Sequence, residues 1–126
     1  MPTVLLVEDD EQVRTFVRSL LARDGYNVVE ARTGAEGLRV AEQMDFDFDL
    51  LLTDMLLPEL SGSDLAEQLL ARRPGLKILF ITGYVEGDIV QRCITELGAT
   101  FLDKPFAPNV LLQRVRDAIG ATGVSV

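Results

Sequence analysis

The stretch VLLVEDDEQVR, residues 4–14, joins two segments of opposite character. Val4–Val7 is an unbroken aliphatic run, which is typical of a strand covered on both faces. The run ends in three consecutive carboxylates, Glu8, Asp9 and Asp10. Two like charges ~4 Å apart repel by about 4 kcal/mol at an effective dielectric near 20. The acidic block is therefore either a solvated turn or a place where a positive charge binds.

Other segments of the chain have the same short apolar character as the first. The predicted strands are Thr3–Val7, Asn27–Ala31, Leu50–Thr53, Lys77–Ile81 and, more weakly, Thr100–Leu102. Continuous apolar runs, in place of alternating ones, favour a parallel sheet whose strands are covered on both faces.

Helical periodicity fills the gaps between these strands. Capping boxes at Thr33 and Ser61 predict the starts of two helices, Gly25 fits a C′ position, and Pro108 fits a first helical turn. Three further helices are predicted from apolar stripes: Val13, Phe16, Val17, Leu20 and Leu21; Ile89, Val90, Cys93, Ile94 and Leu97; and Leu111, Leu112, Val115 and Ile119. Five strand–helix units predict an α/β fold, with a doubly wound parallel sheet, helices on both faces and right-handed crossovers.

Composition excludes several functional classes. A chain of 126 residues that is 48% hydrophobic suits one domain, which we assign to residues 1–120, with 121–126 as a flexible C-terminal tail. No histidine is available for metal binding or acid–base chemistry, and a net charge of −8 argues against direct contact with nucleic acid. No segment resembles a signal peptide or a membrane span, and a single cysteine, Cys93, fits the reducing cytoplasm. Cys93 lies on an apolar stripe, so we expect it to be a buried small hydrophobe.

Polar side chains follow the predicted strands at their carboxyl ends, where open α/β sheets bind their ligands. They are Glu8, Asp9 and Asp10 after the first strand, Thr53 and Asp54 at the end of the third, Thr82 after the fourth, and Asp103 and Lys104 after the fifth. A cluster of Glu8, Asp9 and Asp54 requires a counter-charge, of which Lys104 supplies one part. Oxygen ligands without histidine or cysteine suit Mg²⁺ best.

The same residues predict phosphoryl chemistry. A phosphoryl group repels an anionic attacker, so a carboxylate nucleophile needs a cation that neutralises charge in the transition state. Asp54 is the candidate nucleophile and would form an aspartyl phosphate. Thr82 and Lys104 would surround the phosphoryl oxygens.

Four segments in register resemble the receiver domain of two-component response regulators: VLLVEDD (4–10), LLLTDMLLPELSG (50–62), ILFITGY (78–84) and FLDKPF (101–106). The resemblance implies a flavodoxin-like strand order, 2-1-3-4-5. It also implies a signalling switch, not an enzyme that turns over a separate substrate. FITGYVEGD and GATFLDKPF look most like receivers at the C-terminus of hybrid sensor histidine kinases, and a stand-alone response regulator is the alternative.

The resemblance implies a role for each candidate residue. Asp54 looks like the phosphoacceptor, Asp9 like a direct Mg²⁺ ligand, and Glu8 like an acid that acts through metal-bound water. The main-chain carbonyl of Met55 resembles a further ligand, and Asp54 itself would also bind the metal. Lys104 resembles the lysine that pairs with the phosphoryl group, and the Lys104–Pro105 peptide is expected to be cis. Thr82 and Phe101 match a switch pair. A phosphohistidine on a histidine kinase or a histidine phosphotransfer domain would be the donor, and the fourth helix, fifth strand and fifth helix would form the face that changes and a possible homodimer interface.

This chain departs from the common family pattern at several positions. Phe101 replaces a frequent Tyr, so it has no phenolic hydroxyl, and Gly83 replaces a frequent Ala. Leu56 and Tyr84 lie two residues beyond Asp54 and Thr82, at positions that tune dephosphorylation in the family. An apolar pair there predicts hindered access of the attacking water.

Four other interpretations can be weighed against the switch. A haloacid-dehalogenase-like phosphatase would need an aspartate two residues after its nucleophile, where this chain has Leu56. A receiver fold that is never phosphorylated would not need the full set of Asp9, Asp54 and Lys104. A calcium loop starting at Asp45 lacks its glycine and glutamate, so we expect a turn there. A nucleotide-binding fold would need a glycine-rich loop after the first strand.

Overall fold

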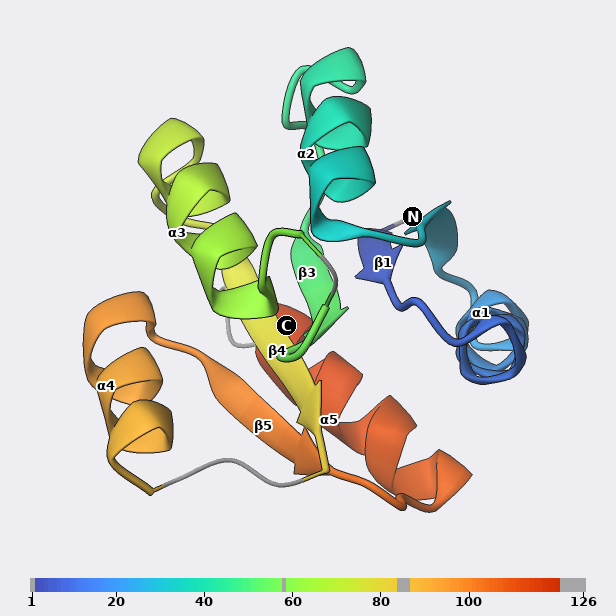
Figure 1. Cartoon of the computed structure of the whole chain (residues 1–126). Coiled ribbons are helices and arrows are strands. Elements are labelled where there is room, and N and C mark those ends of the chain that lie inside the picture. Colours follow the sequence, from blue (N-terminus) through green and yellow to red (C-terminus); the bar gives the residue numbers. More distant parts are fainter. Residues whose placement is uncertain (1, 58, 84–86, 121–126) are drawn as a thin grey trace.

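The computed structural model describes residues 2–57, 59–83 and 87–120, and the predicted tail 121–126 and Tyr84 lie outside this part. Five strands alternate with five helices along it, as Figure 1 shows. The elements are β1 (Thr3–Val7), α1 (Glu11–Arg23), β2 (Asn27–Ala31), α2 (Gly34–Gln43), β3 (Leu50–Asp54), α3 (Gly62–Arg72), β4 (Lys77–Thr82), α4 (Gly87–Leu97), β5 (Thr100–Asp103) and α5 (Pro108–Gly120).

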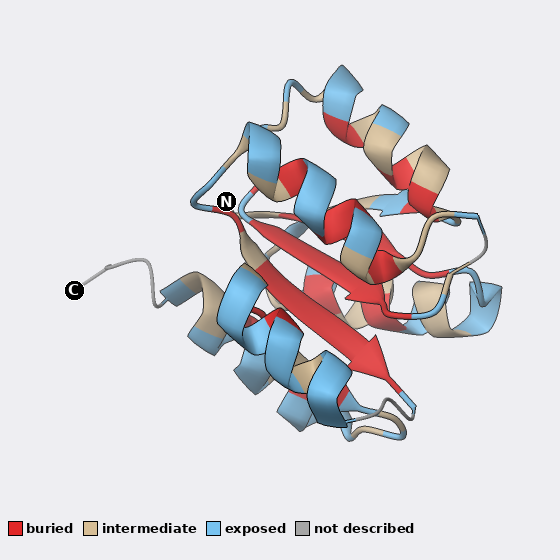
Figure 2. Ribbon diagram, turned by 60° about the vertical axis from the view of Figure 1, so that its left-hand side comes forward, coloured by how far each residue is buried: buried red, intermediate tan, exposed pale blue. Residues whose placement is uncertain are grey.

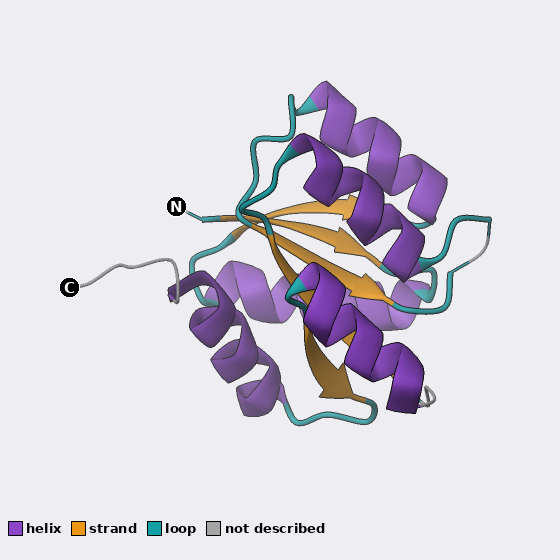
Figure 3. Ribbon diagram, turned by 90° about the vertical axis from the view of Figure 1, so that its left-hand side faces the viewer, coloured by secondary structure: helices purple, strands orange, loops and turns teal. Residues whose placement is uncertain are grey.

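The strands form one parallel sheet in the order β2-β1-β3-β4-β5, which confirms the predicted topology. Its register sets the strand ends side by side: Val7 pairs with Ala31 and Thr53, and Asp54 pairs with Ile81. Because all strands run the same way, their carboxyl ends meet at one edge of the sheet (Figure 3). The residues that follow the strands are therefore gathered there.

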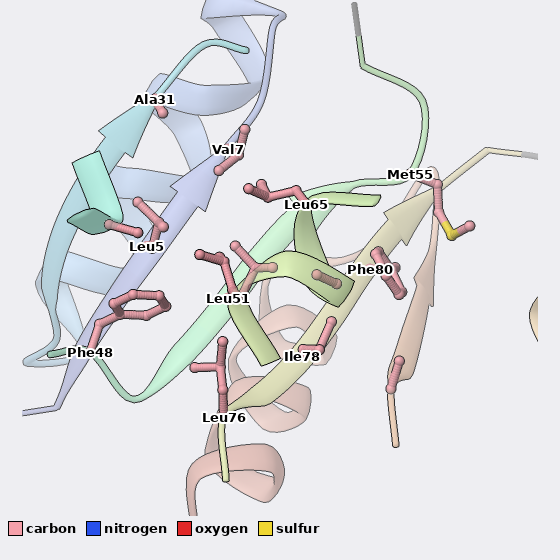
Figure 4. Close-up of a cluster of buried hydrophobic side chains, with 14 of the residues drawn as sticks. Leu5, Val7, Ala31, Phe48, Leu51, Met55, Leu65, Leu76, Ile78 and Phe80 are labelled. Carbon is pink, nitrogen blue, oxygen red and sulfur yellow. The ribbon is translucent and has the colours of Figure 1, made fainter. Parts of the chain in front are cut away.

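The sheet is buried on both faces, so each strand contributes alternate residues to two separate cores. Leu5 and Val7 face the side covered by α2, α3 and α4, whereas Val4 and Leu6 face the side covered by α1 and α5. Figure 2 shows the buried strands between helices whose outer surfaces are exposed. Figure 4 shows side chains of the first core, among them Leu51 and Phe80 from the sheet and Leu65 from α3.

Local signals fix the helix ends. The Asp10 carboxylate accepts hydrogen bonds from Gln12 N and Val13 N and so caps the start of α1. Of the three consecutive acids, Asp10 therefore fits the interpretation as part of a solvated turn. Gly25 adopts a φ of +95° just after the helix, as the predicted C′ residue should. Ser61 begins α3 by accepting from Asp64 N, as its capping box predicts.

The capping box at Thr33 forms with one change of partner. Its hydroxyl accepts from Glu36 N at 3.0 Å, but the Glu36 carboxylate accepts from Arg32 N at 2.6 Å, one residue before the cap. The acidic segment Asp45–Asp49 is a turn into β3, as expected. Asp45 and Phe46 have positive φ, and the Arg73 guanidinium closes the turn by donating to Phe46 O at 2.9 Å.

The helices predicted from apolar stripes form, but two of these stripes are only partly buried. Phe16 on α1 is 47% exposed, and Ile89 and Ile94 on α4 are 41% and 44% exposed. Periodicity identifies an apolar face but does not show how much of it a sheet covers. Helix α4 lies beside the edge strand β5, so only a narrow strip of it, including the buried Cys93, reaches the core. In the α5 stripe, Leu111 and Val115 are buried, and Leu112 and Ile119 pack partly buried against them.

Within the residues described, no helix combines the length and the apolar character that a membrane crossing requires.

Candidate functional site

The candidate site lies at the carboxyl edge of the sheet, where β1, β3, β4 and β5 end. Asp54 is the last residue of β3, Thr82 is the last residue of β4, and Glu8 follows β1 directly. Lys104 follows β5, and its backbone N–H donates to the carbonyl of Thr82 at 2.8 Å. The parallel register thus brings four residues that are far apart in the sequence to one rim.

The Asp54 carboxylate is held at both oxygens. Oδ2 accepts a hydrogen bond from Lys104 Nζ at 2.9 Å, and Oδ1 accepts one from Leu56 N at 3.2 Å. Asp54 is only 8% exposed. Burial lowers the pKa of Lys104, but the hydrogen bond and charge of Asp54 outweigh this effect and raise it. The lysine is therefore a stable cation paired with the carboxylate.

Glu8 is a buried acid with little to stabilise its charge. It is 1% exposed, and its Oε1 accepts from Asp10 N at 3.1 Å, whereas Oε2 lies 3.6 Å from Lys104 Nζ. Burial is the main cause that raises the pKa of Glu8 from 4.5 to about 7, and the charge of Asp54 adds to it. Among the residues that the structure describes, Oε2 has no hydrogen-bond partner.

These acids have the geometry of a cation site. One carboxylate oxygen from each of Glu8, Asp9 and Asp54 lies within 4.8 Å of the other two. Asp9 is exposed, so the group opens to solvent on one side. Lys104 is the only cation paired with these acids in the described chain, so negative charge remains in excess. The all-oxygen donor set and the unpartnered Glu8 Oε2 fit a hard divalent cation such as Mg²⁺.

Met55 presents its carbonyl less freely than these carboxylates. Its oxygen accepts a hydrogen bond from Gly62 N at 3.0 Å, and its own N–H donates to Ile81 O at 3.2 Å. A carbonyl has two lone pairs, so one remains for a cation.

The two predicted switch residues lie on neighbouring strands, Thr82 at the end of β4 and Phe101 within β5. Thr82 is buried, and its Oγ1 has no hydrogen-bond partner in the described part of the chain. Phe101 is partly buried, with its ring 5.4 Å from that of Phe80, so its side chain packs inward against the first core. The Lys104–Pro105 peptide is cis, as predicted.

Leu56 is two residues beyond Asp54 and 72% exposed, so an aliphatic side chain stands at the mouth of the site. Tyr84, the other half of the predicted apolar pair, lies outside the described residues.

Two residues of the site region were not anticipated from the sequence. Arg14 donates from Nη1 to the backbone carbonyl of Glu8 at 2.9 Å. The sequence did contain a clue, because Arg14 is a charged residue on the same face of α1 as the buried Val17 and Leu21. Gly62 packs its Cα against the backbone of Asp54 and Met55. Its signal was a glycine at the first position of a helix, where a close backbone approach is one reason for the missing side chain.

Comparison with known proteins agrees with this geometry. The sequence profile of the response regulator receiver domain matches residues 4–116. Sensor kinase CckA of Brucella abortus is 36% identical over 118 residues, which are 93% of this chain but 12% of CckA. The response regulator receiver protein CpdR of the same organism is 37% identical over 116 residues, which cover 91% of this chain and 94% of CpdR.

Solved structures give the same result. The non-phosphorylated HemR receiver domain from Leptospira biflexa superimposes with a TM-score of 0.86 at 35% identity, and the match covers 100% of both chains. The relatives thus include a receiver that is a small part of a kinase and one that is nearly a whole protein. A phosphatase interpretation finds no support among them.

Proposed function

Because the chain belongs to the receiver domain family of response regulators, we propose that it is a switch in a two-component phosphorelay that is phosphorylated on Asp54. The observation that carries this proposal is the convergence of Asp54, Glu8, Asp9 and Lys104 at one rim of the sheet. We assign the receiver domain to residues 1–120. It would catalyse its own phosphorylation and dephosphorylation and turn over no separate substrate.

In the transfer step, an Asp54 carboxylate oxygen attacks the phosphorus of a phosphohistidine presented by a partner. The new P–O bond forms as the P–N bond breaks, and the imidazole leaves with the electron pair of that bond. The hydrogen bonds from Lys104 and Leu56 N orient the carboxylate before the attack. Lys104 would then follow the phosphoryl group and pair with one of its oxygens.

We assign metal binding to Asp9 and Asp54 directly, to Glu8 through water, and to the Met55 carbonyl. A bound Mg²⁺ would neutralise charge on the carboxylates and the phosphoryl group together. Glu8 contributes a buried carboxyl group whose Oε2 has no hydrogen bond in the described chain, so a bound cation would stabilise its charged form. Asp9, on the open side, is placed to meet the incoming ion.

Phosphorylation would be read out through Thr82 and Phe101. The Thr82 hydroxyl has no partner to give up in the described chain, so it can turn to a phosphoryl oxygen at little cost. Phe101 lies on β5 next to α4, and a change in the position of its side chain would be accompanied by a shift of α4. The face of α4, β5 and α5 would then change, as a modification biases an element with two states. Exposed Ile89 and Ile94 on this face suit a partner or a homodimer contact.

The partner is proposed to be a histidine kinase or a histidine phosphotransfer domain in the cytoplasm, without direct contact with nucleic acid or membrane. The chain spans a small part of the kinase relative and most of CpdR, so relatives fit both settings. We propose the receiver of a hybrid sensor kinase as the setting, with a stand-alone regulator as the alternative. The coding sequence upstream of Met1 distinguishes them, because a hybrid kinase would encode its kinase core there.

The direct test is phosphorylation by acetyl phosphate with Mg²⁺, followed by intact-mass spectrometry. We expect the wild type to gain one phosphoryl group, Asp54→Asn to gain none, and Asp45→Asn, altered at the far edge of the sheet, to behave as the wild type. Removal of Mg²⁺ by EDTA should abolish the gain. A wild type that stays unmodified would support a receiver fold that works without phosphorylation.

A further inference from the structure

Arg14 has an unusual environment for a charged residue on a surface helix. Its side chain is only 11% exposed, although it belongs to the second turn of α1. The guanidinium uses Nη1 to donate to the Glu8 carbonyl at 2.9 Å and Nε to pair with Glu30 Oε1 at 3.3 Å. Arg14 therefore connects the acidic loop after β1 to strand β2.

The contact with Glu8 acts on the loop that carries the acids. The Glu8 carbonyl belongs to the peptide that joins Glu8 to Asp9, so a bond to it fixes the plane of that peptide. The N–H of Glu8 also donates to Ala31 O at 3.1 Å. The main chain of Glu8 is thus hydrogen-bonded on both sides of its Cα, and the Arg14 bond restrains the peptide that leads into Asp9.

Arg18 offers a comparison within the same ion-pair group. It pairs through Nε with the other oxygen of Glu30 at 3.2 Å, but its side chain is 42% exposed. Its contact joins α1 to β2 without touching the acidic loop. If Arg14 only connected the helix to the sheet, Arg18 would have an equivalent role, and replacing either arginine would have the same effect on the acidic loop.

We propose that Arg14, oriented by Glu30, is a positioning residue that holds the Glu8–Asp9 peptide so that the three carboxylates converge before a cation binds. This inference rests on the proposed function, since the cation site is the one used for phosphorylation. It assigns no chemical step to Arg14, which touches neither the reacting atoms nor a bound ion. Its effect is to order the loop in advance, which lowers the cost of binding.

The test compares Arg14→Gln, Glu30→Gln and the matched control Arg18→Gln. Isothermal titration with Mg²⁺ alone should show the affinity of Arg14→Gln reduced on the order of 10-fold, as for other residues that orient metal ligands. Arg18→Gln should stay within about twofold of the wild type, because an exposed ion pair contributes little. Glu30→Gln should fall between them, and Arg14→Lys should recover only part of the loss, since an ammonium cannot reproduce the fixed geometry of two guanidinium contacts.

A second readout needs no metal. In EDTA, amide hydrogen exchange at Glu8 should be faster in Arg14→Gln than in Arg18→Gln, after correction for the global stability of each variant. Equal Mg²⁺ affinities and equal exchange in these two variants would overturn the proposal. If the wild type bound Mg²⁺ but was not phosphorylated, the proposed function would fail while the role of Arg14 stood. If Arg14→Gln did not fold, Glu30→Gln and Arg14→Lys would decide by the same two measurements.

Discussion

Substitution of Gly62 by alanine should damage the site through the backbone alone. A Cβ at this position would lie 2.1 Å from the Asp54 carbonyl oxygen and 3.1 Å from Met55 Cα. Since real Cβ contacts essentially never fall below 3.0 Å, the first turn of α3 and the end of β3 would have to separate by about 0.9 Å or more. Neither neighbour is a side chain that could rotate away. Asp54 would have to move with its backbone.

Two costs follow from this separation. Overpacking that shifts a backbone typically costs about 1 to 3 kcal/mol. The Gly62 N–H bond to Met55 O, now 3.0 Å long, would also weaken, at a cost of about 1 kcal/mol. We therefore expect Gly62→Ala to lower the free energy of unfolding by about 2 to 4 kcal/mol. A misplacement near 1 Å can also reduce a reaction rate by about 100-fold, so phosphorylation should slow by a similar factor.

Urea unfolding followed by circular dichroism measures the first effect, and the rate of modification by acetyl phosphate in the folded protein measures the second. Two glycines serve as controls. Gly75→Ala meets nothing within 4 Å and should stay within about 0.5 kcal/mol of the wild type. Gly34→Ala places its Cβ 2.2 Å from Leu60 O, so it should destabilise to a comparable extent but slow phosphorylation less. If Gly62→Ala were as stable as Gly75→Ala, or if its folded fraction reacted as fast as that of Gly34→Ala, the backbone of Asp54 would not be displaced as expected.

Three further predictions concern the site and the opposite edge of the sheet. In metal-free protein, burial raises the pKa of Glu8 from 4.5 to about 7, so the folded state holds this proton more tightly than the unfolded state. The resulting contribution to the free energy of unfolding is complete below pH 4.5 and is lost as pH rises to about 7. When unfolding is measured in EDTA, the free energy of unfolding of Glu8→Gln should rise relative to that of the wild type by on the order of 3 kcal/mol across this pH range. If the two proteins showed the same dependence of stability on pH, the raised pKa of Glu8 would be contradicted. Leu56→Asn should shorten the lifetime of the phosphorylated form a few-fold, because an amide in place of an exposed aliphatic side chain can orient water; a time course slower than wild type would contradict this. Arg73→Ala should cost about 1 to 2 kcal/mol of stability, because it removes the hydrogen bond to Phe46 O at 2.9 Å. It should leave the phosphorylation rate unchanged, and a slower rate would show that the two ends of the strands are coupled.

The strands and the grouping of the acids with Lys104 were predictable from the sequence for the same reason. A strand buried on both faces carries no charged side chain in its interior, so its end is marked by the first charged residue, as at Glu8 and Asp54. Parallel strands then bring those marks to one edge without further information. The acids and Lys104 could therefore be grouped before any distance was known, although the strand order itself came from the family resemblance.

Other features depend on how much of each element its neighbours cover, which periodicity does not contain. Phe16 and Ile94 lie on apolar stripes yet are exposed, since their helices touch the sheet along a narrow line. Arg14 lies on the buried side of α1 because a backbone carbonyl and Glu30 receive its guanidinium. Gly62 is required by an approach between backbones that are distant in the sequence. Each of these outcomes is set by tertiary contacts.

The buried polar atoms that lack a hydrogen bond indicate independently where the functional site lies. Within the described residues, the buried side-chain oxygens without a hydrogen bond are Glu8 Oε2 and Thr82 Oγ1, and both lie at the carboxyl edge of the sheet. Folded proteins satisfy nearly all such groups, because an unpaired one costs about 1 to 3 kcal/mol. A cation would satisfy the first atom and a phosphoryl oxygen the second. The same two ligands that complete the chemistry at Asp54 would therefore also remove the two defects of the free protein, so metal binding and phosphorylation should both stabilise the fold.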